Sequence, residues 1–229
     1  MMKKMMKYVL STLLALSGIT MIMVLSLQLY AYHVPWYMNR MDKYEISEYT
    51  GIDRNDIERI CEKLAGYLQG TTQDINITAD VHGSSREVFN EKEIQHMVDV
   101  RSIFDLVRLL TAISIVVFIG CAIALIKIYG KKTFYRGIMI TGLVPPVLII
   151  VPLIAAIIDF HGVFTLFHEL FFTNELWLLD PETDILIQML PQPFFESTAL
   201  LWGVTAMAVF FGCIVLGITG LTRMKRGKK

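Results

Sequence analysis

The sequence predicts an all-α integral membrane protein with four transmembrane helices and a small extracytoplasmic α+β cap. Of the 229 residues, 54% are hydrophobic and only 18% are charged, whereas soluble domains carry about 25% charged residues. The apolar residues are also concentrated in four stretches, each close to the roughly 20 residues that a membrane-spanning helix needs. The excess of apolar residues therefore indicates membrane spans rather than an enlarged soluble core.

These stretches divide the chain into seven predicted segments. In chain order they are residues 1–32 (N-terminus and first span), 33–102 (cap), 103–128 (second span), 129–136 (short loop), 137–158 (third span), 159–198 (aromatic-rich interfacial segment) and 199–229 (fourth span and basic tail). Pro145, Pro146 and Pro152 fall within the third span and predict a kink there, because proline lacks a backbone N–H.

The charges predict how the spans are oriented. Twelve of the 21 Lys and Arg residues lie before the first span, between the second and third, and after the fourth, with no acidic residue among them. All 21 Asp and Glu residues lie in or beside the other two connecting segments. The positive-inside rule then predicts a multi-pass protein of the cell membrane, with both termini cytoplasmic and residues 33–102 (the cap) and 159–198 extracytoplasmic.

Composition also excludes several classes of protein. The balance of 21 basic and 21 acidic residues excludes a strongly basic nucleic-acid binder, so no nucleic-acid partner is expected. The apolar content excludes a disordered or collagen-like chain. The three cysteines, Cys61, Cys121 and Cys213, are scattered and odd in number, which gives no indication of a disulfide framework.

Short-range patterns predict the elements of the cap. Asp53 is a candidate N-cap for a helix whose apolar positions are Ile57, Ile60, Cys61, Leu64, Ala65 and Leu68. Residues 74–81 alternate as a half-buried strand does, residues 82–85 predict a turn, and residues 86–89 predict a return strand. Asn90 with Glu93 three residues later resembles a capping box, which starts a helix that continues into the second span.

The interfacial segment combines many aromatic residues with histidines and carboxylates. Asp180–Pro181 predicts a helix start, with the helix running to Met189 or Leu190 before Pro191. Such aromatic density suits the membrane–water interface. These aromatic residues could anchor the protein at the interface as an aromatic belt, or they could form the wall of a cavity for a lipid-like substrate. Aromatic residues alone favour the anchoring belt.

Two histidines are the candidate chemical groups. His96 and Asp99 lie three residues apart, on one helix face, where the carboxylate can orient the imidazole. His168 falls in the aromatic segment on the same predicted side of the membrane. A histidine is often only a structural hydrogen-bonding residue. Other site types fit poorly: Phe172 stands where a zinc-protease helix needs its second histidine, and the sequence has neither a nucleophile elbow nor a glycine-rich phosphate loop.

At these histidines the sequence resembles a known family. The stretches 89–101, 167–184 and 186–195, together with Tyr67–Leu68, are similar to the lipoprotein intramolecular transacylase family. The resemblance extends over essentially the whole chain, and position 101 is Arg where the family often has Lys. The family consists of bacterial membrane enzymes that act on diacylglyceryl-modified lipoproteins. They move the sn-2 acyl chain to the α-amine of the N-terminal cysteine, which gives the lyso-form lipoprotein.

The resemblance implies a catalytic pair, His96 and His168, without assigning base and acid between them. We expect Asp99, Arg101 and Asp180 to support or orient that pair. Residues expected to contact the substrate are Phe171, Phe172, Asn174, Trp177, Phe194 and Phe195. Lipoprotein substrate and membrane lipid are the expected partners, with no cofactor and no metal. The alternatives are a non-enzymatic membrane protein that binds lipid or a partner, and a membrane ester hydrolase.

Overall fold

The computed structural model describes residues 1–226, without the side chains of residues 147 and 148. Lys228 and Lys229, which belong to the predicted basic tail, lie outside the described residues. The chain folds into two compact units. The helical unit contains Met1–Leu27, Val107–Ile154 and Leu200–Lys229, and the cap unit contains Gln28–Leu106 and Ala155–Ala199.

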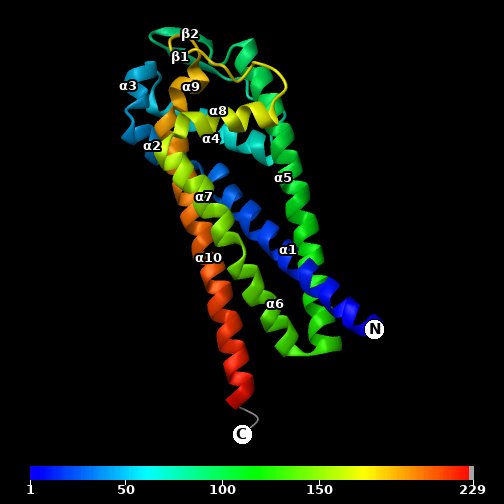
Figure 1. Ribbon diagram of the computed structural model, residues 1–229. Helices are drawn as coiled ribbons and strands as arrows, with labels where there is room; N and C mark the ends of the chain where they lie inside the picture. The colour runs from blue at the N-terminus through cyan, green and yellow to red at the C-terminus, as the bar shows by residue number, and fades with distance from the viewer. Residues whose placement is uncertain (227–229) are drawn as a thin grey trace. The chain divides into compact units, whose positions relative to one another are not determined.

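Three helices of the described chain are long and apolar enough to cross a membrane (Figure 1). They are α1 (Met2–Ala31), α5 (Glu91–Ala124) with its π-helical continuation η1 (Leu125–Tyr129), and α10 (Gln192–Arg226). They coincide with the first, second and fourth predicted spans. Helices α5 and α10 are longer than the predicted spans, because both begin before the apolar run and α10 continues into the basic residues after it.

The third predicted span is a broken pair of helices, α6 (Lys131–Leu143) and α7 (Pro145–Ile158), with a bend at Val144. Pro145 and Pro146 have no N–H to donate to the carbonyls one turn earlier, so the helical hydrogen bonds stop there. Pro152 lies inside α7 without ending it. The predicted kink is thus confirmed as an interruption, and a fourth crossing stays a prediction.

Close packing in the helical unit depends on small residues. A Cβ added at Gly18 of α1 would lie 2.9 Å from Cγ2 of Thr141 and 3.1 Å from Cε2 of Phe118, so α1 approaches both α6 and α5 closely. Leu14, which is fully buried, packs in a cluster with Cys121 of α5. Small residues allow such close helix approach in membrane proteins, where burial of apolar area gives little driving force.

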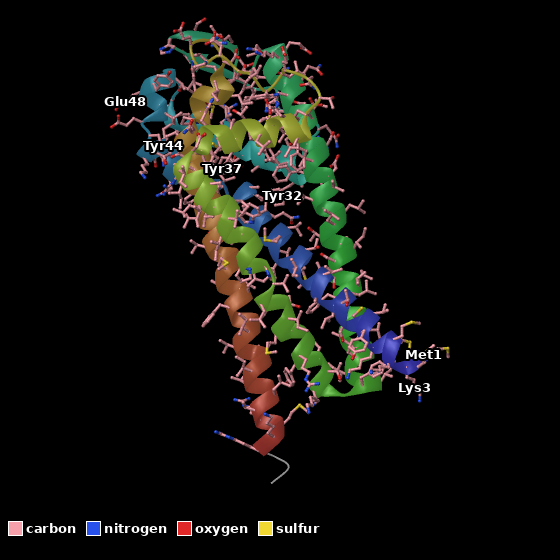
Figure 2. All side chains as sticks on the ribbon, in the orientation of Figure 1. Met1, Lys3, Tyr32, Tyr37, Tyr44 and Glu48 are labelled. Carbon is pink, nitrogen blue, oxygen red and sulfur yellow. The ribbon has the colours of Figure 1, made fainter. Side chains whose placement is uncertain are left out.

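The cap unit is built around α4 (Arg54–Gln69). The six apolar positions predicted for this helix are all buried, and the Asp53 carboxylate accepts a hydrogen bond of 2.8 Å from the N–H of Asn55. Tyr37 on α2, labelled in Figure 2, donates a hydrogen bond from its hydroxyl to the Ala31 carbonyl. The remaining helices of the cap unit are α2 (Val34–Lys43), α3 (Ile46–Thr50), α8 (Phe160–Phe171) and α9 (Ile185–Met189).

The predicted hairpin is present but shorter than expected. Strands β1 (Thr78–Val81) and β2 (Ser84–Glu87) pair antiparallel through a two-residue turn. His82 and Gly83 both have positive φ, 53° and 80°, as such tight hairpin turns require. β1 starts late because the Asp74 carboxylate accepts a hydrogen bond from the N–H of Asn76, which bends the chain at that point.

The two predicted helix starts near the histidines have different outcomes. The capping box is confirmed: the N–H of Asn90 donates to Glu93 Oε2 at 2.7 Å, and the N–H of Glu93 donates to Asn90 Oδ1 at 3.0 Å. The helix start at Asp180 is wrong. Asp180 instead begins a turn, because its carboxylate accepts the N–H of Glu182, and the short helix α9 begins at Ile185.

Candidate active site

The fold of the cap unit brings His96 and His168 together. His96 lies in the second turn of α5, after the Asn90 capping box, and His168 lies in the last turn of α8. Both side chains are buried, with 8% and 6% of their surface exposed. Their ring centroids are 6.1 Å apart and the ring planes are inclined by 33°. The two predicted histidines therefore lie beside each other in the fold.

His168 is held in an aromatic box. Its ring stacks on Trp177 at 4.8 Å and on Phe172 at 5.4 Å, while Phe164 and Phe167 lie against it at 4.2 and 5.3 Å. The N–H of Phe172 also donates to the His168 carbonyl, which closes the end of α8. Phe164 and Phe167 were not among the predicted site residues. The four-residue spacing from Phe164 to His168 places these two on one helix face, whereas no helical spacing indicated Phe167.

One ring nitrogen of His168 has a fixed role. Nδ1 lies 2.7 Å from the carbonyl oxygen of Phe164. A carbonyl oxygen only accepts hydrogen bonds, so Nδ1 carries the proton of the neutral ring and Nε2 holds its lone pair. Nε2 has no hydrogen-bond partner among the described residues. His168 is thereby arranged as a proton acceptor.

His96 is less constrained by polar contacts. The edge of its ring meets Phe172, with the centroids 5.3 Å apart. Neither of its nitrogens has a hydrogen-bond partner among the described residues, and Nδ1 is completely buried. A buried polar atom without a partner costs about 1–3 kcal/mol and often marks a functional site.

Burial keeps both rings neutral. Burial and, to a smaller extent, the neighbouring His168 together lower the pKa of His96 from 6.5 to about 4, against the charge of Asp99, which raises it. Burial also lowers the pKa of His168, against the hydrogen bond to the Phe164 carbonyl, which favours the charged ring. At neutral pH the site therefore holds two uncharged imidazoles.

Asp99 does not hydrogen-bond His96, contrary to the role expected from their spacing. Its Oδ2 accepts a hydrogen bond of 2.8 Å from Nδ2 of Asn174, on the segment after α8. That contact connects α5 with the segment that carries Trp177. Asp99 acts on His96 through its charge alone, and its direct effect is to position Asn174.

Arg101 also has a different role from the expected one. Its guanidinium donates to the carbonyl of Thr72 at 2.9 Å and lies 4.5 Å from the ring centroid of Tyr67. Arg101 therefore holds the end of α4 and the following loop against α5. It supports the fold of the cap beside the histidines without contacting them.

Asp180 belongs to a network that joins its turn to the start of α5. The N–H of Asp180 donates to Asp184 Oδ2, and Asp184 Oδ1 accepts from Nδ2 of Asn90, both at 2.8 Å. Glu93, only 1% exposed, accepts the N–H of Leu186. Asp184 and Glu93 were not predicted as site residues; the capping box was the available signal for Glu93, and nothing local indicated Asp184.

The aromatic residues predicted to contact substrate fall into two groups. Phe172 and Trp177 contact His168, Phe171 is 56% exposed beside Phe167, and Asn174 is exposed. Phe194 is instead a core residue, 4% exposed and packed on Tyr37 at 5.2 Å. Phe195 lies 5.3 Å from Phe164, outside the immediate surroundings of His168.

The described residues contain no group of three or more His, Cys, Asp or Glu side chains placed to hold a metal ion. The chemical groups of the site are two neutral imidazoles, the aromatic side chains around His168, and exposed aromatic and amide side chains beside it.

Comparison with known proteins assigns the chain to a family. The model of the lipoprotein intramolecular transacylase Lit family matches residues 12–195. A search of the curated proteins found no match.

Solved structures agree with this match. The membrane-integral lipoprotein intramolecular transacylase Lit from Bacillus cereus superposes with a TM-score of 0.81 at 24% identity, covering 97% of this chain and 99% of that chain. A variant of it with a histidine replaced by arginine gives 0.77 at 23% identity, covering 100% and 97%. This chain belongs to the lipoprotein intramolecular transacylase family, and it is a membrane-integral acyltransferase.

Proposed function

We propose that this chain moves the sn-2 acyl chain of a diacylglyceryl-modified lipoprotein to the α-amine of its N-terminal cysteine, using His96 and His168. The product is a lyso-form lipoprotein. One observation carries the proposal: three of the four nitrogens of the histidine pair have no hydrogen-bond partner among the described residues, in a buried setting of aromatic side chains.

The chemistry requires one proton to move. The α-amine, with a pKa near 8, attacks the ester carbonyl carbon as it loses a proton to Nε2 of His168. The Phe164 carbonyl stabilises the imidazolium that forms. The bond from the acyl carbon to the glycerol oxygen then breaks, and the same proton passes to that oxygen. His96 donates a hydrogen bond to the reacting oxygens from Nε2, since Nδ1 is completely buried and neither nitrogen has a partner among the described residues.

The arrangement suits an intramolecular reaction. Amine and ester belong to one substrate, so the site mainly has to hold them together and exclude water. We assign the exposed Phe171, together with Phe172 and Trp177, to contact the acyl chain, and Asn174 to the polar part of the substrate. Phe194 is left out of this assignment because it packs in the core.

We also propose the full topology. The broken pair α6 and α7 crosses the membrane as the third of four spans. Both termini and the loop of residues 129–136 are then cytoplasmic, and the cap unit with its histidines faces outward. The uneven distribution of basic residues supports this orientation.

Mass spectrometry of a synthetic diacylglyceryl lipopeptide tests the reaction. Wild-type protein should keep the peptide mass constant and relocate one acyl chain to the amine. His168→Asn should lower the rate by about 10²–10⁴-fold, the usual contribution of acid–base assistance. His96→Asn, which changes the group that hydrogen-bonds the reacting oxygens, should lower it by about 10²–10³-fold. His161→Asn is the matched control, because His161 is exposed on the same helix as His168, and it should retain wild-type rate.

The other outcomes are distinct. Loss of one acyl chain from the peptide would indicate a hydrolase, and an unchanged peptide would indicate a lipid-binding protein. Near-normal transfer by either His→Asn variant would exclude that histidine as an essential catalytic residue.

A further inference from the structure

The helical unit contains a groove of about 290 Å³ between α6 and α10 that the acyl transfer does not use. Its polar lining consists of Lys131 and Tyr135 from α6 and Thr219 and Arg223 from α10. Each pair is spaced by four residues, so both side chains of a pair lie on one face of their helix. The groove is therefore lined by two facing helical turns, each with one cation and one hydroxyl.

The charge of the groove is not neutralised within its unit. Lys131 and Arg223 are exposed, and neither has an ion-pair partner among the described residues. The sequence of the helical unit contains no Asp or Glu at all. Two cations beside one hollow, with no carboxylate in the unit to balance them, favour an anionic ligand.

The shape of the groove depends on two glycines of α10. A Cβ at Gly217 would lie 2.9 Å from the backbone oxygen of Tyr135, and a Cβ at Gly220 would overlap the Tyr135 ring. The ring therefore lies directly on α10 and forms a wall of the groove. This wall of the groove is therefore set by the packing of α6 against α10.

We propose that this groove binds the phosphodiester headgroup of an anionic glycerophospholipid. Lys131, Arg223 and the Tyr135 hydroxyl supply donors to the phosphate oxygens, since Thr219 already donates to the Val215 carbonyl. Leu216 and Met224 line the same groove and offer apolar contact to the start of the acyl chains. These apolar residues favour a lipid over free phosphate, which shares the anionic group but lacks chains.

Native mass spectrometry of the full-length protein in detergent tests the proposal, with phosphatidylglycerol and phosphatidylcholine as probes. One phosphatidylglycerol should bind more tightly than phosphatidylcholine. Lys131→Gln and Arg223→Gln should each weaken phosphatidylglycerol binding about fivefold, and the double variant about 30-fold. Lys132→Gln and Lys225→Gln, which change exposed cations outside the groove lining, should have less than about a twofold effect.

Three outcomes would overturn the proposal. The first is equal weakening by the groove and control variants, which would indicate diffuse attraction to all the basic residues. The second is equal binding of both lipids. The third is displacement of phosphatidylglycerol by inorganic phosphate at equal concentration, which would indicate a simple anion site. If the double variant does not fold, the lipid binding of the two single variants tests the proposal. The test measures lipid binding only, so its outcome is independent of acyl-transfer activity.

Discussion

Nδ1 of His168 lies 2.7 Å from the carbonyl oxygen of Phe164, one helical turn earlier on α8. This contact settles which nitrogen of the neutral ring carries the proton. It also provides an acceptor that is already in place when the ring becomes charged. The Phe164 backbone carbonyl thus orients the His168 ring and stabilises its charged form, as a carboxylate does in many acid–base sites.

Protein stability should fall in acid because of the buried histidines. The folded protein binds fewer protons than the unfolded chain between the pKa of buried His96, about 4, and its ordinary value of 6.5. The free energy of unfolding therefore decreases as pH falls through that window, by about 3 kcal/mol when the pKa difference is converted. Thermal unfolding of wild type and His96→Asn from pH 7 to pH 4 measures this.

His96→Asn should lose less stability than wild type over that range. His33→Asn is the control, since it removes a histidine that lies outside the pair. Parallel pH curves for wild type and His96→Asn would contradict a depressed pKa at His96.

Trp177 should support turnover through its contact with His168. Its ring stacks on the imidazole at 4.8 Å, so Trp177→Ala should loosen the ring and lower kcat by about 10–100-fold. Trp177→Phe retains an aromatic face and should recover most of this loss. The neighbouring Leu178→Ala, at an exposed position, serves as the control. If activity decreases only in proportion to the amount of folded protein, Trp177 instead serves to anchor the protein at the membrane interface.

Glu93 should stabilise the cap by joining α5 to α9. Its carboxylate accepts the N–H groups of Asn90 and Leu186, and Glu93→Gln would place an NH₂ group against one of these donors. We expect a loss of about 1.5–3 kcal/mol in the free energy of unfolding. Thermal unfolding compared with Glu91→Gln, an exposed change in the same helical turn, measures it. Equal stability of the two variants would exclude a structural role for the carboxylate.

Topology can be tested with two reporters. A tag inserted after Gly70, in the cap unit, and a fusion after the last residue should report opposite sides of the membrane. Cysteine labelling in intact cells gives an independent readout. If both reporters lie on one side, the four-span arrangement is wrong, and the outward position of the histidines no longer follows from it.

Local signals in the sequence were reliable where the structure uses local contacts. The Asn90–Glu93 capping box, the Asp53 cap and the buried face of α4 all form as predicted, because partners lie within one or two turns. The break before Pro145 follows equally from the chemistry of proline.

Contacts between distant segments were not predictable in the same way. The i,i+3 spacing of His96 and Asp99 indicated a pair, yet the Asp99 carboxylate binds Asn174 on another segment. Asp180–Pro181 has the residue types of a helix start, but hydrogen bonds to Asp184 and Glu182 retain a turn there. The pairing of His96 with His168 was predicted from the family resemblance, because no local sequence pattern relates α5 to α8.

Phe172 performs two tasks with one residue, since its N–H closes α8 on the His168 carbonyl while its ring stacks on the imidazole. The number of residues from His168 to Phe172 is therefore fixed by geometry. One inserted residue would rotate the following side chain by about 100° around the helix axis. The same residue could then no longer make both the backbone hydrogen bond and the ring contact with His168. A change in the length of this stretch would therefore disturb the site even if the types of its residues were retained.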